Sequence, residues 1–475
     1  MLFRSSCPSP SYGYPFWLLA LTFRSSRPAF CGRLTSPVIF IQQVRCVIKM
    51  KERPVAIDLF AGCGGMSLGL EAAGFDVAVA VEFDAVHSVV HHFNFPYCKT
   101  ICKDISKVSS NEIFEALKSG GYKKDVDLIA GGPPCQGFSH IGKRQIDDPR
   151  NSLVFEYLRL ISEIKPRYFI FENVPGIATG EHKQFLNELI SEFESIGYVI
   201  DKPIEILDAS HYGAPQKRKR LILIGSKKGL NKAQYPLPSH ADIESTKGDL
   251  FFQNKLPLVT VGDAIADLEK FPAFTDLDKG IPVSKFSYKG KREKYSLVAS
   301  DTYKLCHQRN VDQRIYGHIG SIHTEVSIER FSLAEQGTVE SKSRFFKLHP
   351  AGLCNTLRAG TNSDKGAYTA PRPIHYSIPR CITVREAARL HTFPDWFQFH
   401  RTIWHGFREI GNAVIPVLSK ELGSSVIKAL KIDAASLSTK NLEKMPGSLL
   451  DYNMSQASEY WGITDNVIPK RKRIF

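Results

Sequence analysis

Residues 55–65 read VAIDLFAGCGG, and this stretch decides the fold. A short apolar run from Val55 leads directly into a turn that contains three glycines. A helical pattern of apolar residues follows through Leu68, Leu70 and Ala73. Glycines in such a turn let the backbone approach a ligand closely at the end of a strand. The stretch therefore predicts the first strand, turn and helix of an α/β sheet.

Further apolar runs alternate with helical patterns downstream. We predict strands at 77–81, 126–130, 168–171 and 221–224, and helices at 85–93, 151–164 and 185–196. This alternation predicts a parallel sheet with helices on both faces. After about residue 227 the pattern breaks into short segments punctuated by proline. Helical periodicity returns at 383–391 and 415–430.

The chain is ordinary in composition but basic in charge. It has 475 residues, 43% hydrophobic and 23% charged, which excludes a disordered or collagen-like protein. The formal net charge of +14 suggests an anionic partner, with nucleic acid first. Ten of these charges lie in residues 1–50 and 470–475, so the body of the chain is only mildly basic.

The ends and the cysteines point to a cytoplasmic protein. The apolar run at 16–23 is too short to span a bilayer. A signal-peptide core or an acid-free organelle-targeting segment is the alternative interpretation. Met50 is followed by Lys51, Glu52 and a strand-like run, as a natural chain start would be, so we expect residues 1–49 to be a dispensable basic extension. The ten cysteines are dispersed, which favours a reducing compartment and neither disulfides nor a metal site.

Cys135 is the candidate nucleophile. It lies in Gly-Gly-Pro-Pro-Cys-Gln-Gly-Phe-Ser, directly after the third predicted strand. Two prolines stiffen this loop and cannot extend the strand, so the cysteine is held out toward a ligand. Most isolated cysteines are inert core residues, but this setting favours a nucleophile.

Two carboxylates also follow predicted strands. Glu82 ends the second strand, where an acid can accept hydrogen bonds from ribose hydroxyls. Glu172 ends the run 168–171, where a poorly solvated carboxyl group can act as a proton donor, although an ordinary exposed strand-end glutamate is the alternative. In open α/β sheets ligands bind at the carboxyl ends of strands, so these residues should converge on one site with Cys135.

A basic row precedes the strand at 221–224. On an extended segment Gln216, Arg218 and Arg220 lie on one face, and the two intervening lysines lie on the other. Two arginines and a glutamine in a row suit phosphate or base contacts. A solvated basic turn is the alternative interpretation.

Together these residues resemble the cytosine-C5 DNA methyltransferases of the bacterial restriction–modification type. The resemblance covers about 51–226 and 346–425, and five motifs occur in the family's order. They are Phe-Ala-Gly-Cys-Gly-Gly at 60–65, Pro-Pro-Cys-Gln at 133–136, Glu-Asn-Val at 172–174, Gln-x-Arg-x-Arg at 216–220 and Gly-Asn-Ala-Val-Ile-Pro at 411–416. Ala413 departs from the family, where serine is frequent.

The resemblance implies roles for the candidate residues. Cys135 would add to C6 of cytosine, Glu172 would bind N3 and the exocyclic amine, Arg220 would hold the O2 side, and Arg218 would bind near a phosphate. The methyl donor would be S-adenosylmethionine, with no metal, and Glu82 on its ribose. The residues implied in cofactor binding are Phe60, Gly62, Cys63, Gly64, Gly65, Glu82, Phe83, Asp104, Ile105, Pro134, Asn412 and Val414.

The resemblance also implies a Rossmann-like α/β methyltransferase sheet with a smaller, irregular target-recognition domain. We expect a catalytic domain at 50–272, the recognition domain at 273–375, a return to the catalytic domain at 376–432, and a C-terminal tail at 433–475. The segment 285–314 carries eight Lys/Arg among three acids and three interleaved tyrosines, which suits the wall of a DNA cleft. The loop after Cys135, at 142–150, would close over a flipped base.

The expected substrate is a specific double-stranded DNA sequence, and the expected enzyme is a cytoplasmic, membrane-free monomer. Its partner in function, without physical contact, would be a cognate restriction endonuclease. Methylation of tRNA is an alternative within the same chemistry, which the substantial middle domain disfavours. A catalytically dead DNA-binding protein on the same fold is a second alternative, disfavoured because the motifs around Cys135 and Glu172 are intact.

Overall fold

A computed structural model describes residues 52–123, 125–134, 152–180, 182–242, 254–274, 280–285, 301–310, 313–360 and 372–463. Cys135 with its loop, and therefore the predicted lid at 142–150, lies outside the described residues. So do the extension at 1–49, much of the basic segment 285–314 and the basic C-terminal end.

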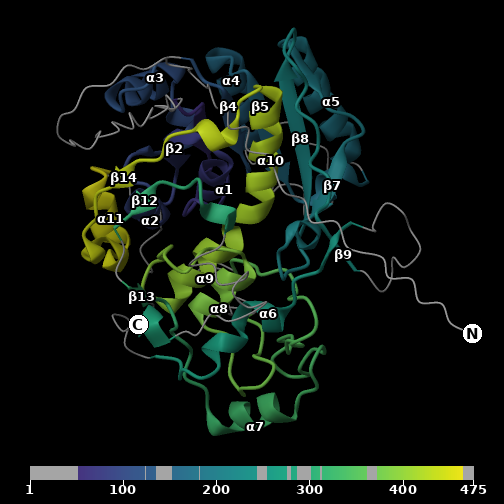
Figure 1. The fold of residues 1–475 in the computed structure, drawn as a ribbon, viewed down its shortest axis with the longest axis vertical. Coiled ribbons are helices and arrows are strands. Elements are labelled where there is room, and N and C mark those ends of the chain that lie inside the picture. Colours follow the sequence, from purple (N-terminus) through teal and green to yellow (C-terminus); the bar gives the residue numbers. More distant parts are fainter. Residues whose placement is uncertain are drawn as a thin grey trace, which may run out of the picture. The chain divides into compact units, whose positions relative to one another are not determined.

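The main sheet has eight strands in the order β3-β2-β1-β4-β5-β8-β6, with β7 paired to β8. Its strands β2, β4, β5, β7 and β8 are labelled in the upper part of Figure 1. Its strands are β1 (Val55–Leu59), β2 (Asp76–Glu82), β3 (Lys99–Cys102), β4 (Leu128–Gly131), β5 (Tyr168–Asn173), β6 (Tyr198–Ile200), β7 (Glu205–Asp208) and β8 (Lys219–Lys227). The first five are parallel, and four of them are predicted from the sequence, whereas β3 is not. The expectation that the strand at 221–224 is also parallel is wrong. The long strand β8 runs antiparallel to β5, so it begins where β5 ends.

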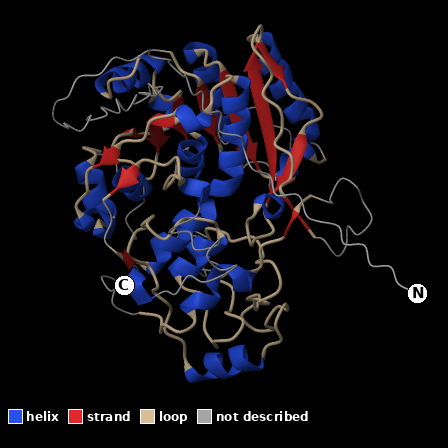
Figure 2. Ribbon diagram, in the orientation of Figure 1, coloured by secondary structure: helices blue, strands red, loops and turns tan. Residues whose placement is uncertain are grey.

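Helices cover both faces of the sheet, as the alternating pattern predicts (Figure 2). The helices are α1 (Gly65–Ala73), α2 (Ala85–Asn94), α3 (Ser110–Ser119), α4 (Ser152–Ile164), α5 (His182–Ser195), α6 (Val261–Ile265), α7 (Glu325–Leu333), α8 (Val384–Leu390), α9 (Ile403–Asn412), α10 (Pro416–Ala429) and α11 (Met454–Tyr460). One apolar core lies under α1 and α10, and the other lies under α3, α4 and α5. No helix in the described ranges is both long and apolar enough to cross a membrane.

The region between β8 and α8 is irregular, as expected. Its strands are two-residue pairings: β9 (His240–Ala241), β10 (Leu256–Pro257), β11 (Ile281–Pro282), β12 (Gln308–Arg309) and β13 (Arg314–Ile315). A last short strand, β14 (Asn441–Leu442), pairs with β12. The residues that we expect to form a C-terminal tail are thus folded as far as Ile463, and Trp461 donates to the carbonyl of Ala85 on α2 at 3.3 Å.

Helix α10 docks directly on α1 through small residues. A Cβ on Gly69 would lie 2.4 Å from the carbonyl oxygen of Pro416 and from Cβ of Ser419, so only glycine allows this approach. The Ser419 hydroxyl donates to the carbonyl of Met66 at 2.8 Å. Helices α1 and α10 are therefore interlocked.

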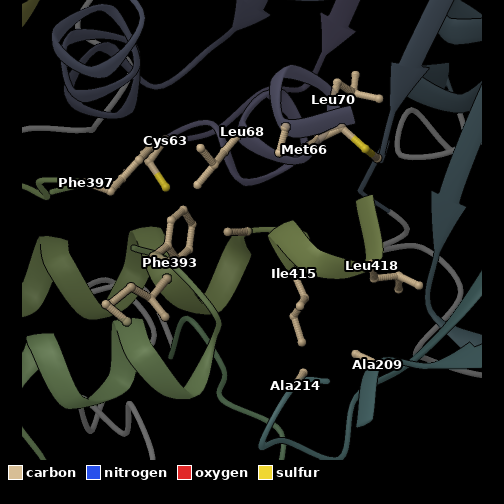
Figure 3. Close-up of a cluster of buried hydrophobic side chains, with 14 of the residues drawn as sticks. Cys63, Met66, Leu68, Leu70, Ala209, Ala214, Phe393, Phe397, Ile415 and Leu418 are labelled. Carbon is tan, nitrogen blue, oxygen red and sulfur yellow. The ribbon is translucent and has the colours of Figure 1, made fainter. Parts of the chain in front are cut away.

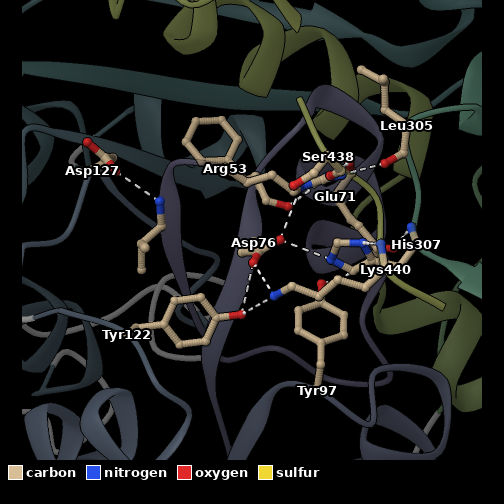
Figure 4. Close-up of polar contacts among 12 residues, drawn as sticks. Arg53, Glu71, Asp76, Tyr97, Tyr122, Asp127, Leu305, His307, Ser438 and Lys440 are labelled. Carbon is tan, nitrogen blue, oxygen red and sulfur yellow. Dashed lines mark hydrogen bonds and ion pairs between the residues drawn. The ribbon is translucent and has the colours of Figure 1, made fainter. Parts of the chain in front are cut away.

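A buried polar network fixes the middle and end of the chain to the start of β2 (Figure 4). The Asp76 carboxylate lies 3.1 Å from Arg53, 2.9 Å from His307 and 2.7 Å from Lys440. Burial opposes ionisation of Asp76, but the contacts with His307 and Lys440 lower its pKa to about 2.

Two residues of the basic segment belong to this interior and not to a DNA-facing wall. Arg309 pairs with the buried Glu71 at 2.7 Å, and Tyr303 is buried with its hydroxyl donating to the carbonyl of Thr392. The expectation that these two side chains line a DNA cleft is wrong, because their polar groups are satisfied inside the fold.

Candidate active site

A cavity of about 660 Å³ lies at the carboxyl ends of β1, β2, β4 and β5. This is the edge at which the sequence predicts a ligand site. Twelve of the predicted site residues line it: Phe60, Gly62, Glu82, Phe83, Asp104, Ile105, Pro134, Glu172, Arg218, Arg220, Asn412 and Val414. Within the described residues, no group of three or more His, Cys, Asp or Glu side chains is arranged to hold a metal ion.

Glu82 holds the glycine turn in place. Its Oε2 accepts a hydrogen bond from the amide of Gly62 at 2.8 Å, and its Oε1 accepts from the amide of Asp84 at 2.8 Å. Gly64 has a φ of +105°, and a Cβ there would lie 2.3 Å from the ring of Phe95. One carboxylate thus fixes the ends of β1 and β2 around the cavity, beside the half-exposed Phe83 ring.

Three residues of the turn, Cys63, Gly64 and Gly65, support it from behind and do not line the cavity. Cys63 is buried in the apolar core near Phe393 and Phe397 (Figure 3). Its thiol donates weakly to the carbonyl of Glu409 at 3.6 Å. Burial raises the pKa of this thiol well above its ordinary value. The core occupies the side of the turn to which the Cys63 side chain points, so the expected role of Cys63 in cofactor binding would fall to its backbone.

Asp58 is a cavity residue that the sequence-based list misses. Its Oδ2 accepts from the Ser67 hydroxyl at 2.6 Å, and that hydroxyl lies 3.0 Å from Nε2 of His91. Burial raises the pKa of Asp58 to about 7 and lowers the pKa of His91 to about 3. A charged residue inside an otherwise apolar strand is the signal that could have identified it.

Glu172 and Arg220 form an ion pair at the other end of the cavity. Nε of Arg220 lies 2.6 Å from Oε1 of Glu172, and both side chains are nearly buried. Gly132 allows this arrangement, because a Cβ there would lie 2.6 Å from Oε2 of Glu172. The neighbouring Asn173 donates to the carbonyl of Pro133 at 3.1 Å. The strand that carries the acid therefore also anchors the loop that leads to Cys135.

Arg218 is placed differently from the sequence-based interpretation. Its guanidinium is buried and donates to the carbonyls of Leu357, Gly411 and Ala413 at 2.8, 3.0 and 3.0 Å. Burial and the nearby charge of Arg220 lower its pKa to about 9. The expected phosphate contact is wrong for the terminal nitrogens of Arg218, because Nη1 and Nη2 already donate to two segments of the fold, whereas its Nε is buried without a partner among the described residues.

Gln216 shares this buried face, as the predicted alternation requires. Its amide donates to the carbonyl of Leu390 at 3.2 Å, and its Oε1 accepts from the amide of Leu357 at 3.1 Å. Lys217 and Lys219, on the opposite face, are exposed. The alternation is confirmed, whereas the base or phosphate role expected for Gln216 is wrong.

Helix α9 supplies one wall of the cavity, and Asn412 at its end is the only residue of this helix among the predicted site residues. Trp404 and Arg408 line the cavity together with Asn412. Arg408 lies 3.4 Å from the carboxylate of Asp84, which caps α2. A Cβ on Gly65 would lie 2.3 Å from the carbonyl of Val414, so the turn that follows α9 presses against the glycine turn. No local pattern near residue 404 marks this wall.

Comparisons with known proteins agree with this geometry. The family described as C-5 cytosine-specific DNA methylase matches residues 55–428. Type II methyltransferase M.XorII of Xanthomonas oryzae pv. oryzae is 44% identical over 431 residues, which cover 89% of this chain and 95% of the relative. Type II methyltransferase M.DdeI of Desulfomicrobium norvegicum is 32% identical, covering 78% and 88%.

Solved structures show the same likeness. A prophage-encoded DNA modification methyltransferase from E. coli superposes with a TM-score of 0.62 at 33% identity, covering 80% of this chain and 99% of the other. The Dnmt2 methyltransferase of S. pombe, at 16% identity and a TM-score of 0.51 with coverage of 80% and 100%, shares the fold. The motifs, the cavity and these comparisons agree, and the chain belongs to the C-5 cytosine-specific DNA methylases.

Proposed function

We propose that this enzyme transfers a methyl group from S-adenosylmethionine to C5 of a cytosine flipped out of a specific duplex DNA sequence. It would act as a cytoplasmic monomer and protect host DNA from a cognate restriction endonuclease. The observation that carries the proposal is the Glu172–Arg220 pair, which shares one cavity with the Glu82-held turn and with Pro134, the residue before Cys135. The names of the M.XorII and M.DdeI relatives support the type II assignment.

The cavity suits the cofactor. Glu82 offers a carboxylate at the end of β2, where ribose hydroxyls would donate to it, and the exposed Phe83 ring offers a face for adenine. Asp104 would lie near the adenine, with Ile105 beside it, while Asn412 and Val414 would close the cavity from the opposite side. The cofactor would supply the sulfonium methyl group.

The protein's own groups would prepare the cytosine. C5 of cytosine is a weak nucleophile, and a bond between the Cys135 sulfur and C6 would push an electron pair toward C5. Glu172 would share its hydrogen bonds with N3 and the exocyclic amine, which thymine lacks, while Arg220 would hold both Glu172 and the O2 side of the ring. Once C5 has bonded to the methyl group, a base would take the C5 proton and the Cys135 sulfur would leave C6 as a thiolate, which restores the aromatic ring.

The base must leave the helix for this chemistry. The reactive groups lie in a cavity, whereas a stacked cytosine exposes only its edge, so the target nucleotide would have to rotate out of the duplex. Unstacking and unpairing would cost a few kcal/mol, which contacts with the DNA backbone must offset.

Sequencing tests the substrate. Bisulfite or single-molecule sequencing of DNA from cells that express the chain should reveal 5-methylcytosine at one short sequence. The same DNA should resist an endonuclease that cuts at that sequence. Methylation found in tRNA and absent from DNA would refute the DNA assignment.

Two variants test the covalent step. Cys135→Ala should abolish methyl transfer while calorimetry still detects binding of the cofactor. Cys381→Ala, at a buried cysteine that does not line the cavity, should remain active. A duplex with 5-fluorocytosine at the target should trap a covalent adduct with the wild-type enzyme only. Robust methylation by Cys135→Ala would contradict the mechanism.

A further inference from the structure

Asp58 is a buried acid that faces the cavity without an ionic partner. The residue is 1% exposed, yet it is one of those that line the cavity. One of its oxygens, Oδ2, accepts from the Ser67 hydroxyl at 2.6 Å. Within the described residues, no lysine or arginine forms an ion pair with this carboxyl group. Asp58 therefore has acceptor capacity left for a donor inside the cavity.

The groups around Asp58 are neutral or negative, so they do not stabilise a charge on it. The Ser67 hydroxyl donates to Asp58, and its 3.0 Å contact with His91 therefore requires a proton on Nε2 of that ring. Burial lowers the pKa of His91 to about 3, so the ring is neutral. The other titratable groups that face Asp58 are the carboxylate of Glu82 and three groups that burial keeps protonated, on Cys63, Cys98 and Tyr157. Burial raises the pKa of Asp58 itself to about 7, so below pH 7 the free protein holds mostly the neutral carboxyl group.

The strand order of the sheet relates Asp58 to the parts of the cofactor. At the carboxyl edge Asp104 follows β3, Glu82 ends β2, Asp58 lies one residue before the end of β1, and Pro134 follows β4. These strands are neighbours in the order β3-β2-β1-β4. In the proposed function the adenine lies beside Asp104 and the ribose on Glu82, so the next part of the cofactor, its aminocarboxyl chain, extends toward β1. The strand beyond, β4, leads to Cys135.

We propose that Asp58 binds the α-amino group of the methyl donor, and that its carboxyl group releases a proton to the solvent as it does so. The inference rests on the proposed function and names a binding residue for the end of the cofactor that lies away from Asp104. An ammonium group supplies both a positive charge and N–H donors, whereas a sulfonium centre has no hydrogen to donate. A carboxylate as buried as Asp58 needs a charged and hydrogen-bonded partner, and the ammonium group is the part of the cofactor that meets this need.

Calorimetry of cofactor binding, in buffers that differ in ionisation enthalpy, counts the released protons. The pairing lowers the pKa of Asp58 from its value of about 7 in the free enzyme, so binding should strengthen as the pH rises toward 7. Binding of S-adenosylmethionine should release about 0.9 proton at pH 6, where the α-amino group itself is fully protonated. Its dissociation constant should fall about eightfold between pH 5.5 and pH 6.5.

Two related ligands identify the group that Asp58 binds, and they need only the wild-type enzyme. 5′-Methylthioadenosine lacks the aminocarboxyl chain, so its binding should release no proton. S-Adenosylhomocysteine keeps the amino group but lacks the sulfonium charge, and it should release as many protons as the methyl donor. Proton release with 5′-methylthioadenosine, or its loss with S-adenosylhomocysteine, would overturn the assignment to the amino group.

Asp58→Asn keeps the shape of the neutral carboxyl group, so it should bind S-adenosylmethionine without proton release and with little dependence on pH. Glu409→Gln is the matched control, because Glu409 is equally buried and burial raises its pKa, but it does not line the cavity. Its proton release should equal that of the wild type. A wild type that binds S-adenosylmethionine without releasing a proton, or an Asp58→Asn variant that releases as many, would overturn the role of Asp58 and leave the proposed function standing. A wild type that binds no S-adenosylmethionine would overturn the proposed function itself.

Discussion

Replacement of Arg218 by methionine tests whether its guanidinium acts as a clamp, that is, joins two segments inside the fold, or instead contacts DNA. The guanidinium donates three hydrogen bonds to carbonyls of two segments that lie outside the main sheet. Hydrogen bonds that involve a charged group contribute about 1.5–3 kcal/mol each. Methionine also avoids the cost of burying a charge, so the loss is smaller than three such bonds. We expect Arg218→Met to lower the free energy of unfolding by about 3–5 kcal/mol.

Urea denaturation, followed by circular dichroism and tryptophan fluorescence without DNA, measures this loss. Lys217→Met is the matched control, because Lys217 is adjacent in sequence but exposed, and its stability should change by about 0.5 kcal/mol at most. The salt dependence of DNA binding should be the same for Arg218→Met as for the wild type. An Arg218→Met protein as stable as the wild type, with its salt slope reduced by about 1, would refute the clamp and restore the phosphate role.

Three further predictions follow from buried groups. Burial raises the pKa of Asp58 to about 7, so the folded protein favours the protonated carboxyl group. The free energy of unfolding of the wild type, relative to that of Asp58→Asn, should therefore fall by about 1.4 kcal/mol per pH unit between about pH 5 and pH 7. A difference between the two urea midpoints that does not change with pH would count against the raised pKa. Gly132→Ala should displace Glu172 and slow methyl transfer about 100-fold, with unfolding little changed, and a normal rate would show that the close approach is unimportant. Arg309→Met should lower the free energy of unfolding by about 3–5 kcal/mol, because it leaves the buried Glu71 carboxylate without its ion-pair partner. The double variant Arg309→Met, Glu71→Gln should regain part of this loss. A double variant as unstable as Arg309→Met would exclude an unpaired charge as the cause.

The sheet could be predicted because its signals are local. Four of the five parallel strands are short apolar runs, and the glycine turn, Glu82 and Glu172 lie at the ends of three of them. The fifth, β3, reads KTIC, is only partly buried and is missed by the sequence-based prediction. Parallel strands present these ends at one edge, so their convergence needs no long-range information. The antiparallel β8 also carries a local signal, since the alternation of Gln216, Arg218 and Arg220 is visible in the sequence.

The errors arise where burial depends on distant segments. The sequence shows which face Arg218 occupies, but the carbonyls that bury it come from residues 357, 411 and 413. Cys63 has an equally distant neighbour, because α9 supplies the carbonyl that its thiol contacts. In the sequence Arg309 is one of several charges in a basic segment. Its partner Glu71 lies more than two hundred residues earlier in the chain, so the pairing is visible only in the structure. Composition identifies cations, but only tertiary packing distinguishes free cations from paired ones.

The interlocking of α1 and α10 has a consequence for the synthesis of the enzyme. All eight strands of the main sheet are complete by residue 227, whereas one wall of the cavity comes from residues 403–414 and is held by a helix that ends at residue 429. A nascent chain in which this last stretch has not yet been synthesised therefore has a complete sheet, but its cavity lacks one wall. Truncated products should be inert as methyltransferases, and a chain cut between the sheet and α9 should regain activity only when both fragments are supplied together.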